Sequence, residues 1–272
     1  MAESKNERYT LGYGDSSMDW MTSRTADGHG SFLLPYLKSG MNLLDCGCGP
    51  GTLTVGYAEK IAPGSAKGLD KEIDQTKLVA EFAEQNGISN LEFIEGDIYS
   101  LPFPDNYFDA VFASAVLGSV ANADEVVQEM VRVLKPAGVI AIKEFDHGSD
   151  IIWPQSQIIA QSTELNHRLR ARNNHEQNCG RRLKEFLTNN DCTVDYVNAY
   201  FDQQSDRTTL EKYIERNNGL FYEVLGPQYI ELGWCTAADI DAQVDEWRKF
   251  AVNPAAIYLA AWLEVIGTKS AE

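Results

Sequence analysis

The segment from Met41 to Ile61 restricts the fold of this chain more than any other. A short apolar run over residues 41–46 leads into the letters GCGPG at residues 47–51, and apolar residues then recur at helical spacing over residues 52–61. A strand that passes through glycines into a helix lets a ligand approach the backbone at the positively polarised start of that helix. We therefore predict a nucleotide-binding α/β unit at this point of the chain.

Strands and helices alternate beyond this unit. The predicted strands cover residues 41–46, 66–69, 91–94, 108–113, 139–144, 192–200 and 256–268. The predicted helices cover residues 52–61, 73–86, 124–134, 151–172, 181–189, 208–225 and 236–250, and Thr236 is expected to cap the last one. This alternation indicates βαβ crossovers, so the expected fold class is α/β, with a Rossmann-like sheet of seven mostly parallel strands and helical additions.

The chain is expected to form one domain over residues 1–272, because it contains no linker and no internal repeat. We expect residues 1–40 to form an N-terminal helical cap and residues 41–145 the cofactor-binding core. Residues 148–178 and 205–252 are expected to be helical insertions. Since additions at the carboxyl end of a parallel sheet lie where ligands bind, we expect them to act as a lid.

The composition disfavours several partners and locations. The formal net charge is −17, and an acidic surface repels phosphate backbones, so we expect no nucleic-acid partner. No apolar stretch approaches the roughly 20 residues that cross a bilayer, so we expect no membrane insertion. The first residues lack the pattern of a secretory or organellar signal, and the five cysteines lack zinc spacing. We expect a cytoplasmic protein with reduced thiols and no bound metal.

Three aspartates lie at or just beyond the ends of the first three predicted strands. Asp45 precedes the glycine turn, Asp70 ends the second strand, and Asp97 follows the third. At Asp45 a carboxylate can receive an ammonium group, and at Asp70 it can accept both hydroxyls of an adenosine ribose. At Asp97 it can accept the adenine amino group while Ile98 packs on the ring. A second interpretation of Asp70 is a cap for the following helix.

The spacing of the glycines distinguishes between ligands. Gly47, Gly49 and Gly51 alternate, whereas the dinucleotide fingerprint G-x-G-x-x-G requires a glycine where this chain has Thr52. Together with Asp45, this spacing favours a ligand with an amino-acid end over a pyrophosphate. It therefore disfavours a nicotinamide-dependent oxidoreductase.

Residues 41–145 resemble a class I methyltransferase that depends on S-adenosylmethionine (SAM), of the UbiE-like small-molecule group. The matching segments are LDCGCGPGT (44–52), GLD (68–70), EGDI (95–98), LPF (101–103), FDAV (108–111) and VLKPAG (133–138). The resemblance implies a seven-stranded sheet with a reversed last strand and SAM as the cofactor. The residues that it implies as SAM contacts are Asp45, Gly47, Gly49, Asp70, Asp97, Ile98 and Ser114.

Four further residues are candidates for the cofactor site. Cys48 lies within the glycine turn, and Gly96 lies directly before Asp97. Lys71 either lies along the adenine or points to water. Arg24, in a stretch that resembles the lead-in helix of some of these enzymes, either binds the methionine carboxylate of SAM or is a surface arginine.

Methyl transfer from a sulfonium mainly requires an acceptor that is held in line and shielded from water. A general base is needed only where the acceptor atom carries a proton. The candidates are His147 and Glu144, and His147 is favoured because imidazole titrates near neutral pH. A second interpretation of both residues is that they are ordinary polar side chains of the loop that follows a strand. Many similar enzymes carry a His or Glu just after the fourth strand, but this chain has AVLGSV at residues 115–120, so no such role is transferred.

Aromatic residues in the additions are candidates for binding the acceptor. We expect Tyr9, Tyr13, Trp20 and Trp153 to contact a small-molecule methyl acceptor that is apolar or aromatic. The favoured function is thus methyl transfer from SAM to an O, N or C atom of that acceptor. The alternatives are a catalytically silent SAM-binding regulatory protein and an NAD-dependent oxidoreductase. The sequence leaves open whether the chain acts as a monomer or a homodimer.

Overall fold

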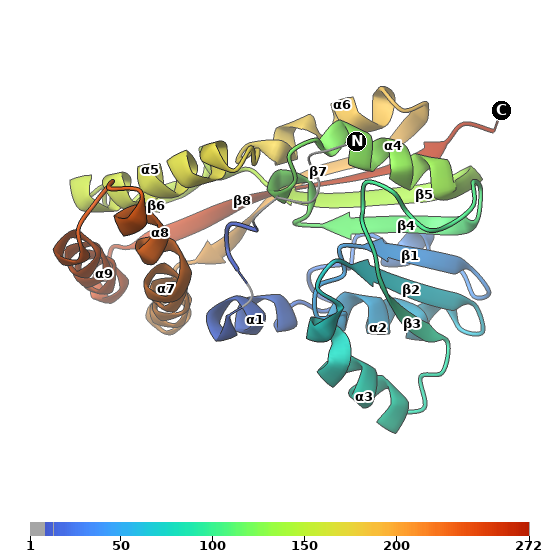
Figure 1. The fold of residues 1–272 in the computed structure, drawn as a ribbon, viewed down its shortest axis with the longest axis horizontal. Helices are drawn as coiled ribbons and strands as arrows, with labels where there is room; N and C mark the ends of the chain where they lie inside the picture. The colour runs from blue at the N-terminus through green and yellow to red at the C-terminus, as the bar shows by residue number, and fades with distance from the viewer. Residues whose placement is uncertain (1–8, 13, 272) are drawn as a thin grey trace.

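The computed structural model describes residues 9–12 and 14–271, and it has the predicted α/β fold (Figure 1). The strands are β1 (Asn42–Cys46), β2 (Ser65–Asp70), β3 (Leu91–Glu95), β4 (Phe108–Ser114), β5 (Leu134–Phe145), β6 (Ile151–Trp153), β7 (Cys192–Gln204) and β8 (Ile257–Lys269). The α-helices are α1 (Asp15–Thr22), α2 (Thr52–Ile61), α3 (Lys77–Gln85), α4 (Ala123–Val133), α5 (Gln157–Arg172), α6 (Leu183–Thr188), α7 (Arg207–Leu220), α8 (Gly226–Glu231) and α9 (Ala237–Val252).

The strands form one mostly parallel sheet in the order β3-β2-β1-β4-β5-β8-β6, with β7 paired to β8. Strands β1 to β5 are parallel to one another, whereas β8 runs antiparallel to β5, β6 and β7. The strand order reverses at β1 and β4, and this is the point of a doubly wound sheet where ligands bind. The reversed last strand that the resemblance implies is therefore present.

Both faces of the sheet are covered, because successive residues of a strand point to opposite faces. Leu44 and Val111 pack with Val126 and Met130 of α4 on one face. Leu43 and Phe112 belong to the cluster on the other face, which contains Leu53, Tyr57 and Ile61 of α2. Figure 1 shows α4 and α6 on one side of the sheet and α2 on the other. This double burial explains the continuous apolar character of the inner strands.

Helices α1, α5, α7, α8 and α9, called the helical half below, lie beside the sheet at the left of Figure 1. Their own cores include Ile159, Leu210 and Phe250 in one cluster and Leu169 and Tyr229 in a second. The long strand β8 connects this half to the sheet. The cap predicted for α9 is confirmed: Thr236 accepts from the amide of Asp239, whose carboxylate accepts from the amide of Thr236 in return.

The sheet has one strand more than predicted. Residues 151–153 were expected to begin a long helix but form β6, which pairs with residues 257–259 of β8. Pro154 follows directly, and proline disfavours the helical conformation in the residue before it, so α5 begins only at Gln157. Strand β7 also continues to Gln204, beyond the predicted end at Tyr200, because its partner β8 continues alongside.

The N-terminal region is less helical than expected. Within its described part, residues 9–12 and 14–40, it contains α1 and one short 3-10 helix, Leu34–Tyr36. Turns occupy most of residues 24–33. Gly28 and Gly30 weaken a helix in this stretch, and Pro35 is tolerated only because it stands at the start of the 3-10 helix.

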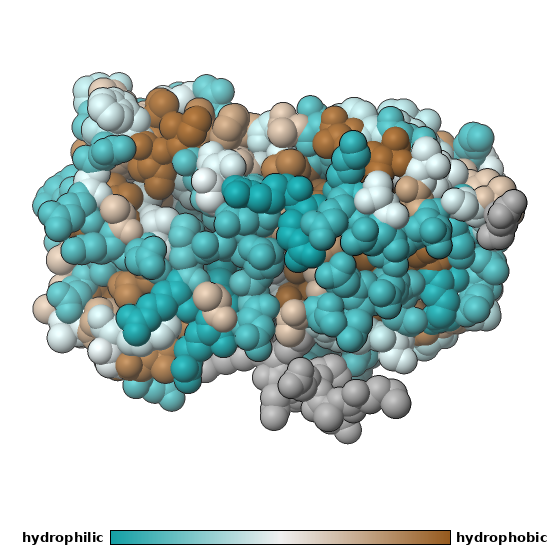
Figure 2. Space-filling model, turned by 90° about the horizontal axis from the view of Figure 1, so that it is seen from above, coloured by the Kyte–Doolittle hydropathy of each residue, from teal (hydrophilic) through white to brown (hydrophobic). Residues whose placement is uncertain are grey.

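The surface is mostly hydrophilic (Figure 2). Hydrophilic residues dominate the face seen in Figure 2, and hydrophobic residues occupy separate areas between them. In the part of the chain that the structure describes, no helix combines the length and the apolar character needed to cross a membrane.

Candidate active site

Three glycines form the turn between β1 and α2, and all three have a left-handed backbone. The φ angles of Gly47, Gly49 and Gly51 are +69°, +53° and +88°, values that glycine adopts without steric strain. A Cβ atom at Gly47 would lie 2.6 Å from a methyl carbon of Val116. At Gly49 the nearest atom to such a Cβ would be Sδ of Met21, at 3.6 Å. The turn thus requires glycine because of its backbone conformation, and at Gly49 a Cβ atom would only reach van der Waals contact with Met21.

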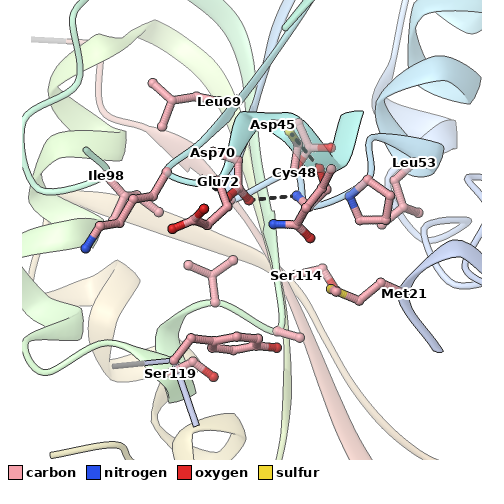
Figure 3. Close-up of a pocket in the computed structure, with 18 of the residues that line it drawn as sticks. Met21, Asp45, Cys48, Leu53, Leu69, Asp70, Glu72, Ile98, Ser114 and Ser119 are labelled. Carbon is pink, nitrogen blue, oxygen red and sulfur yellow. Dashed lines mark hydrogen bonds between the residues drawn. The ribbon is translucent and has the colours of Figure 1, made fainter. Parts of the chain in front are cut away.

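Asp70 and the end of β2 hold this turn in place. Oδ2 of Asp70 accepts a hydrogen bond from the amide of Gly49 at 2.8 Å (Figure 3), and Oδ1 accepts one from the amide of Glu72 at 2.9 Å. The carbonyl oxygen of Leu69 accepts from the amide of Gly47 at 2.7 Å. Because each carboxylate oxygen has a further lone pair, Asp70 can accept additional hydrogen bonds from a ligand. It does not cap α3.

Asp45 is almost fully buried, at 2% exposure, although it lies at the edge of the same turn. Its Oδ2 accepts a hydrogen bond from the hydroxyl of Thr54 at 2.7 Å. Burial raises the pKa of Asp45 to about 7, because the charged carboxylate is poorly solvated there. A cationic ligand group would offset that desolvation and favour the ionised form.

Asp97 and Ser114 lie directly after β3 and at the end of β4. Oδ1 of Asp97 accepts a hydrogen bond from the amide of Tyr99 at 2.9 Å, which leaves the other carboxylate oxygen for a ligand. The hydroxyl oxygen of Ser114 lies 2.9 Å from Nε2 of His29. Burial lowers the pKa of His29 far below its usual range, so this imidazole is neutral.

A cavity of about 440 Å³ lies at the carboxyl ends of these strands, and we call it the glycine-turn cavity. All of the predicted cofactor residues line it: Arg24, Asp45, Gly47, Cys48, Gly49, Asp70, Lys71, Gly96, Asp97, Ile98 and Ser114. Its wall also contains Met21, Leu53, Glu72, Val116 and Ser119, which the sequence did not indicate. Figure 3 shows several of these side chains around the same space.

Arg24 is half-buried and lies at the wall of the glycine-turn cavity. Its guanidinium carbon lies 3.8 Å from the ring centre of Trp20 and 5.3 Å from that of Trp262. Its Nη2 atom is buried and has no hydrogen-bond partner within the described residues. Burial lowers the pKa of Arg24 to about 10, so the group is still charged at neutral pH. This side chain can receive an anionic group of a ligand.

A second cavity of about 160 Å³ adjoins the first, and we call it the aromatic chamber. The two share Tyr9, Met21, Ala115 and Ser119 as lining residues. The chamber is further lined by the aromatic residues Trp20, Phe145, Tyr213, Phe221, Trp247, Tyr258 and Trp262. It also contains the polar residues His147, Asp150, Asn166, His167, Arg170, Asp202 and Arg216.

The predicted acceptor residues divide between three positions. Tyr9 and Trp20 line the aromatic chamber. Trp153 lies on β6 with 56% of its surface exposed, outside the residues that line either cavity. Tyr13 lies outside the described residues.

His147 lines the chamber and is held by a carboxylate. Its Nδ1 atom lies 3.1 Å from Oδ2 of Asp150. Asp150 also accepts hydrogen bonds from the hydroxyl of Tyr258 at 3.2 Å and from the amide of Ala261 at 2.8 Å. Since Asp150 is fixed from two other sides, it orients the imidazole and favours the tautomer with the proton on Nδ1. The Nε2 atom is then the basic nitrogen.

Glu144 occupies a different environment. It is fully buried, and its Oε1 accepts a hydrogen bond from the amide of Leu117 at 2.7 Å. Burial raises the pKa of Glu144 to about 7. It is not among the residues that line the glycine-turn cavity or the aromatic chamber. Its contact with Leu117 fixes the segment after β4.

Most chamber residues were not indicated by the sequence, but one could have been. Trp262 lies opposite Phe145 in the antiparallel pairing of β8 with β5. Because the last strand was expected to be reversed, its register beside the fifth strand could have placed Trp262 near the site. Arg170, Tyr213 and Trp247 carry no local signal of this kind.

Comparison with known proteins identifies the family. A family model described as a methyltransferase domain matches residues 37–213. A protein called "Probable methyltransferase ltbC" from Aspergillus luteorubrus is 36% identical over 149 residues, which cover 52% of this chain and 52% of that protein. A demethylmenaquinone methyltransferase from Listeria welshimeri is 39% identical over 123 residues, covering 45% of this chain and 52% of the relative. The chain thus matches about half the length of these curated relatives.

The fold is also found among solved structures. The [4+2]-cyclase SpnF has a TM-score of 0.58 and 22% sequence identity, with coverage of 95% of this chain and 82% of that one. At this identity the likeness concerns the fold. The family model, in contrast, spans more than half of the sequence, and it agrees with the strand order and with the glycine turn. The chain therefore belongs to the methyltransferase domain family, and it has the sequence motifs and the fold of class I SAM-dependent methyltransferases.

Proposed function

We propose that this protein binds SAM in the glycine-turn cavity and transfers its methyl group to a small, apolar or aromatic acceptor in the aromatic chamber. The observation that carries the proposal is the composition of the two cavities. One gathers every residue expected to contact SAM, and it shares part of its wall with a second that is rich in aromatic side chains. The acceptor atom is an O, N or C atom.

The residues of the glycine-turn cavity fit the parts of SAM. We propose that Asp45 receives the ammonium group and that Arg24 receives the carboxylate. The raised pKa of Asp45 and the unpartnered Nη2 of Arg24, within the part of the chain described, both support this pair, because each group would gain its missing counter-charge. Gly47 and Gly49 leave the backbone accessible, and Cys48 completes the turn.

The adenosine end would lie toward β2 and β3. We propose that Asp70 accepts the ribose hydroxyls and that Asp97 accepts the adenine amino group, with Ile98 against the ring. Lys71 and Gly96 line the same cavity, and so does Ser114, whose neighbour Ala115 lines both cavities.

When bound, SAM supplies a methyl group that is activated by a positively charged sulfur. The acceptor's lone pair forms the new bond to carbon as the carbon–sulfur bond breaks, and the electron pair of that bond stays on sulfur. We propose that the chamber holds the acceptor in line and limits water access, and these are the main contributions that this reaction needs from the protein. Where the acceptor atom carries a proton, Nε2 of His147 takes it, and Asp150 stabilises the resulting imidazolium.

We further infer that the additions act as a lid over the acceptor. The helical insertions at residues 148–178 and 205–252 contribute Arg170, Tyr213 and Trp247 to the chamber, and the N-terminal region contributes Tyr9 and Trp20. Such segments come from separate parts of the chain and enclose one site, so they can open and close over it.

We infer that the partner of this protein is a small molecule and that the protein acts in the cytoplasm. A homodimer is the assembly to be tested. The net charge of −17 argues against a nucleic acid, and five free cysteines fit a reducing compartment.

Two measurements test the proposed function. Calorimetric titration should detect binding of SAM but not of NAD, and NAD binding in the absence of SAM binding would refute it. Incubation with SAM and fractionated small-molecule extracts should yield a product heavier by one CH₂ unit in mass spectrometry. SAM binding without such a product in any extract would instead favour a catalytically silent regulatory protein.

A further inference from the structure

Arg170 is a buried cation in the aromatic chamber, and the proposed methyl transfer does not use it. It lies on α5 with 3% exposure, and its guanidinium carbon lies 4.7 Å from the ring centre of Phe145. Its Nε and Nη1 atoms are buried without a hydrogen-bond partner among residues 9–12 and 14–271. A buried charge without a partner is strongly destabilising, so such an arrangement indicates a partner that binds from outside the chain.

The carboxylates that line the same chamber have other partners. Asp150 is engaged by His147, Tyr258 and the amide of Ala261. Asp202 accepts a hydrogen bond from the side-chain amide of Gln204 at 3.1 Å, and it acts on the pKa of Arg216, not on that of Arg170.

The charge of Glu144 acts on the pKa of Arg170, but the two side chains do not form an ion pair. Within the described residues, no carboxylate oxygen lies close enough to a guanidinium nitrogen of Arg170, 4 Å or less, to form an ion pair. Glu144 also acts on Arg24, and its own pKa is raised to about 7, so it is only partly ionised at neutral pH. One partly charged carboxylate therefore stands against two buried guanidinium groups.

The ligand of the neighbouring cavity adds a positive charge beside the chamber. In the placement proposed above, Asp45 pairs with the ammonium group of SAM and Arg24 with its carboxylate, so the charge left without a partner is that of the sulfonium. Neutralising the chamber then requires an anion, and a planar guanidinium is the side chain best matched to a carboxylate. Asn166 lies one turn before Arg170 on α5, also lines the chamber, and adds an amide group to the same wall.

We propose that Arg170 binds a carboxylate of the methyl acceptor, so that the substrates are small carboxylic acids with an aromatic or apolar body. This inference rests on the proposed function for the place of the cofactor. The aromatic lining receives the body of the acid, and the acid group lies against Arg170.

The same geometry assigns the acid group to binding and not to reaction. A guanidinium that neutralises a carboxylate withdraws its charge and makes it a poorer nucleophile, so a different atom of the acceptor receives the methyl group. His147 lines the same chamber, and both it and Arg170 lie against the ring of Phe145, at 4.5 Å between ring centres for His147. One small molecule in the chamber can therefore contact both Arg170 and His147.

The test is calorimetric titration of the full chain, saturated with S-adenosylhomocysteine, with benzoate, phenylacetate and cinnamate. Each acid is compared with its primary amide, which has nearly the same shape but no charge. We expect at least one acid to bind tenfold or more tightly than its amide, as a charge-assisted hydrogen bond contributes. Equal binding of each acid and its amide, or no binding of any acid, would overturn the proposal.

Arg170→Met keeps an apolar stem of similar length and should remove the preference for the acid while leaving amide binding unchanged. The matched control is Arg172→Met on the same helix, where the arginine is exposed, and it should keep the preference. An Arg170→Met protein that keeps the preference would also overturn the proposal. If this variant misfolds in circular dichroism, the ratio of acid to amide binding in the unmodified chain still decides.

The first step of the same experiment separates the two proposals. If S-adenosylhomocysteine does not bind to the unmodified chain, the proposed function fails, whatever the acids do. If it binds and the acids show no preference, only the assignment of Arg170 fails.

Discussion

The two cavities of this protein are built in different ways. The glycine-turn cavity is formed mainly by short segments that directly follow β1, β2, β3 and β4, where the topology of a parallel sheet places them together. The aromatic chamber contains residues as far apart in the sequence as Tyr9 and Trp262, and much of its lining comes from α1, α5, α7, α9 and β8. Sheet topology thus determines the first cavity, whereas the packing of the helical half determines the second.

This difference suggests a division of labour. A site fixed by strand order can keep its ligand while the helices beside it change, and a site built from those helices can change its ligand without disturbing the sheet. We therefore expect substitutions in the helical half to act on the acceptor and on turnover, and substitutions beside the strands to act on SAM.

The largest effect is expected for His147→Gln. With an acceptor whose reacting atom is protonated, kcat should fall by about 10²- to 10⁴-fold, because the general base is lost. SAM affinity, measured by calorimetry, should not change. The matched control is His167→Gln, since His167 also lines the chamber, with its ring centre 6.5 Å from that of His147. It should change kcat by only a few fold. Equal losses in the two variants would contradict the role of the His147–Asp150 pair.

Asp70→Ala should weaken SAM binding by about 100-fold or more. The substitution removes the acceptor of the ribose hydroxyls and the hydrogen bond that holds the amide of Gly49. Asp74→Ala is the control, because Asp74 is an exposed acid a short distance further along the chain. A fully retained SAM affinity in Asp70→Ala would break the proposed link between strand ends and cofactor.

The sequence was informative about the two cavities to very different degrees. Asp45, Asp70 and Asp97 could be assigned to one sheet edge because each lies at or just beyond the end of a predicted strand, and parallel strands bring such positions together. Arg170 could not be assigned in this way, since the direction of α5 relative to the sheet depends on packing between distant segments. Trp153 was misjudged for a related reason: its aromatic character indicated a pocket, but β6 leaves it exposed.

SAM affinity should also depend on pH through Asp45. Burial raises the pKa of this carboxyl to about 7, and an ammonium group binds to its ionised form. As the pH falls below about 7, binding must release a proton, so the affinity should decrease by up to about tenfold per pH unit. Calorimetry between about pH 5.5 and pH 7.5 measures this slope. In Asp45→Asn the binding should be weak and this pH dependence should disappear, whereas an unchanged slope would assign it to another group.

The smallest effects test whether the two halves of the molecule unfold together. Thr236 caps α9 in the helical half with a reciprocal pair of hydrogen bonds, and Asn122 caps α4 beside the sheet with a single bond of 3.4 Å. Thr236→Ala should cost about 1 kcal/mol of unfolding free energy and Asn122→Ala somewhat less. Since β8 runs through both halves, we expect one transition in urea, with the same midpoint by circular dichroism and by tryptophan fluorescence. If Thr236→Ala shifts only the fluorescence transition, the helical half unfolds separately and can open over the acceptor without disturbing the cofactor site.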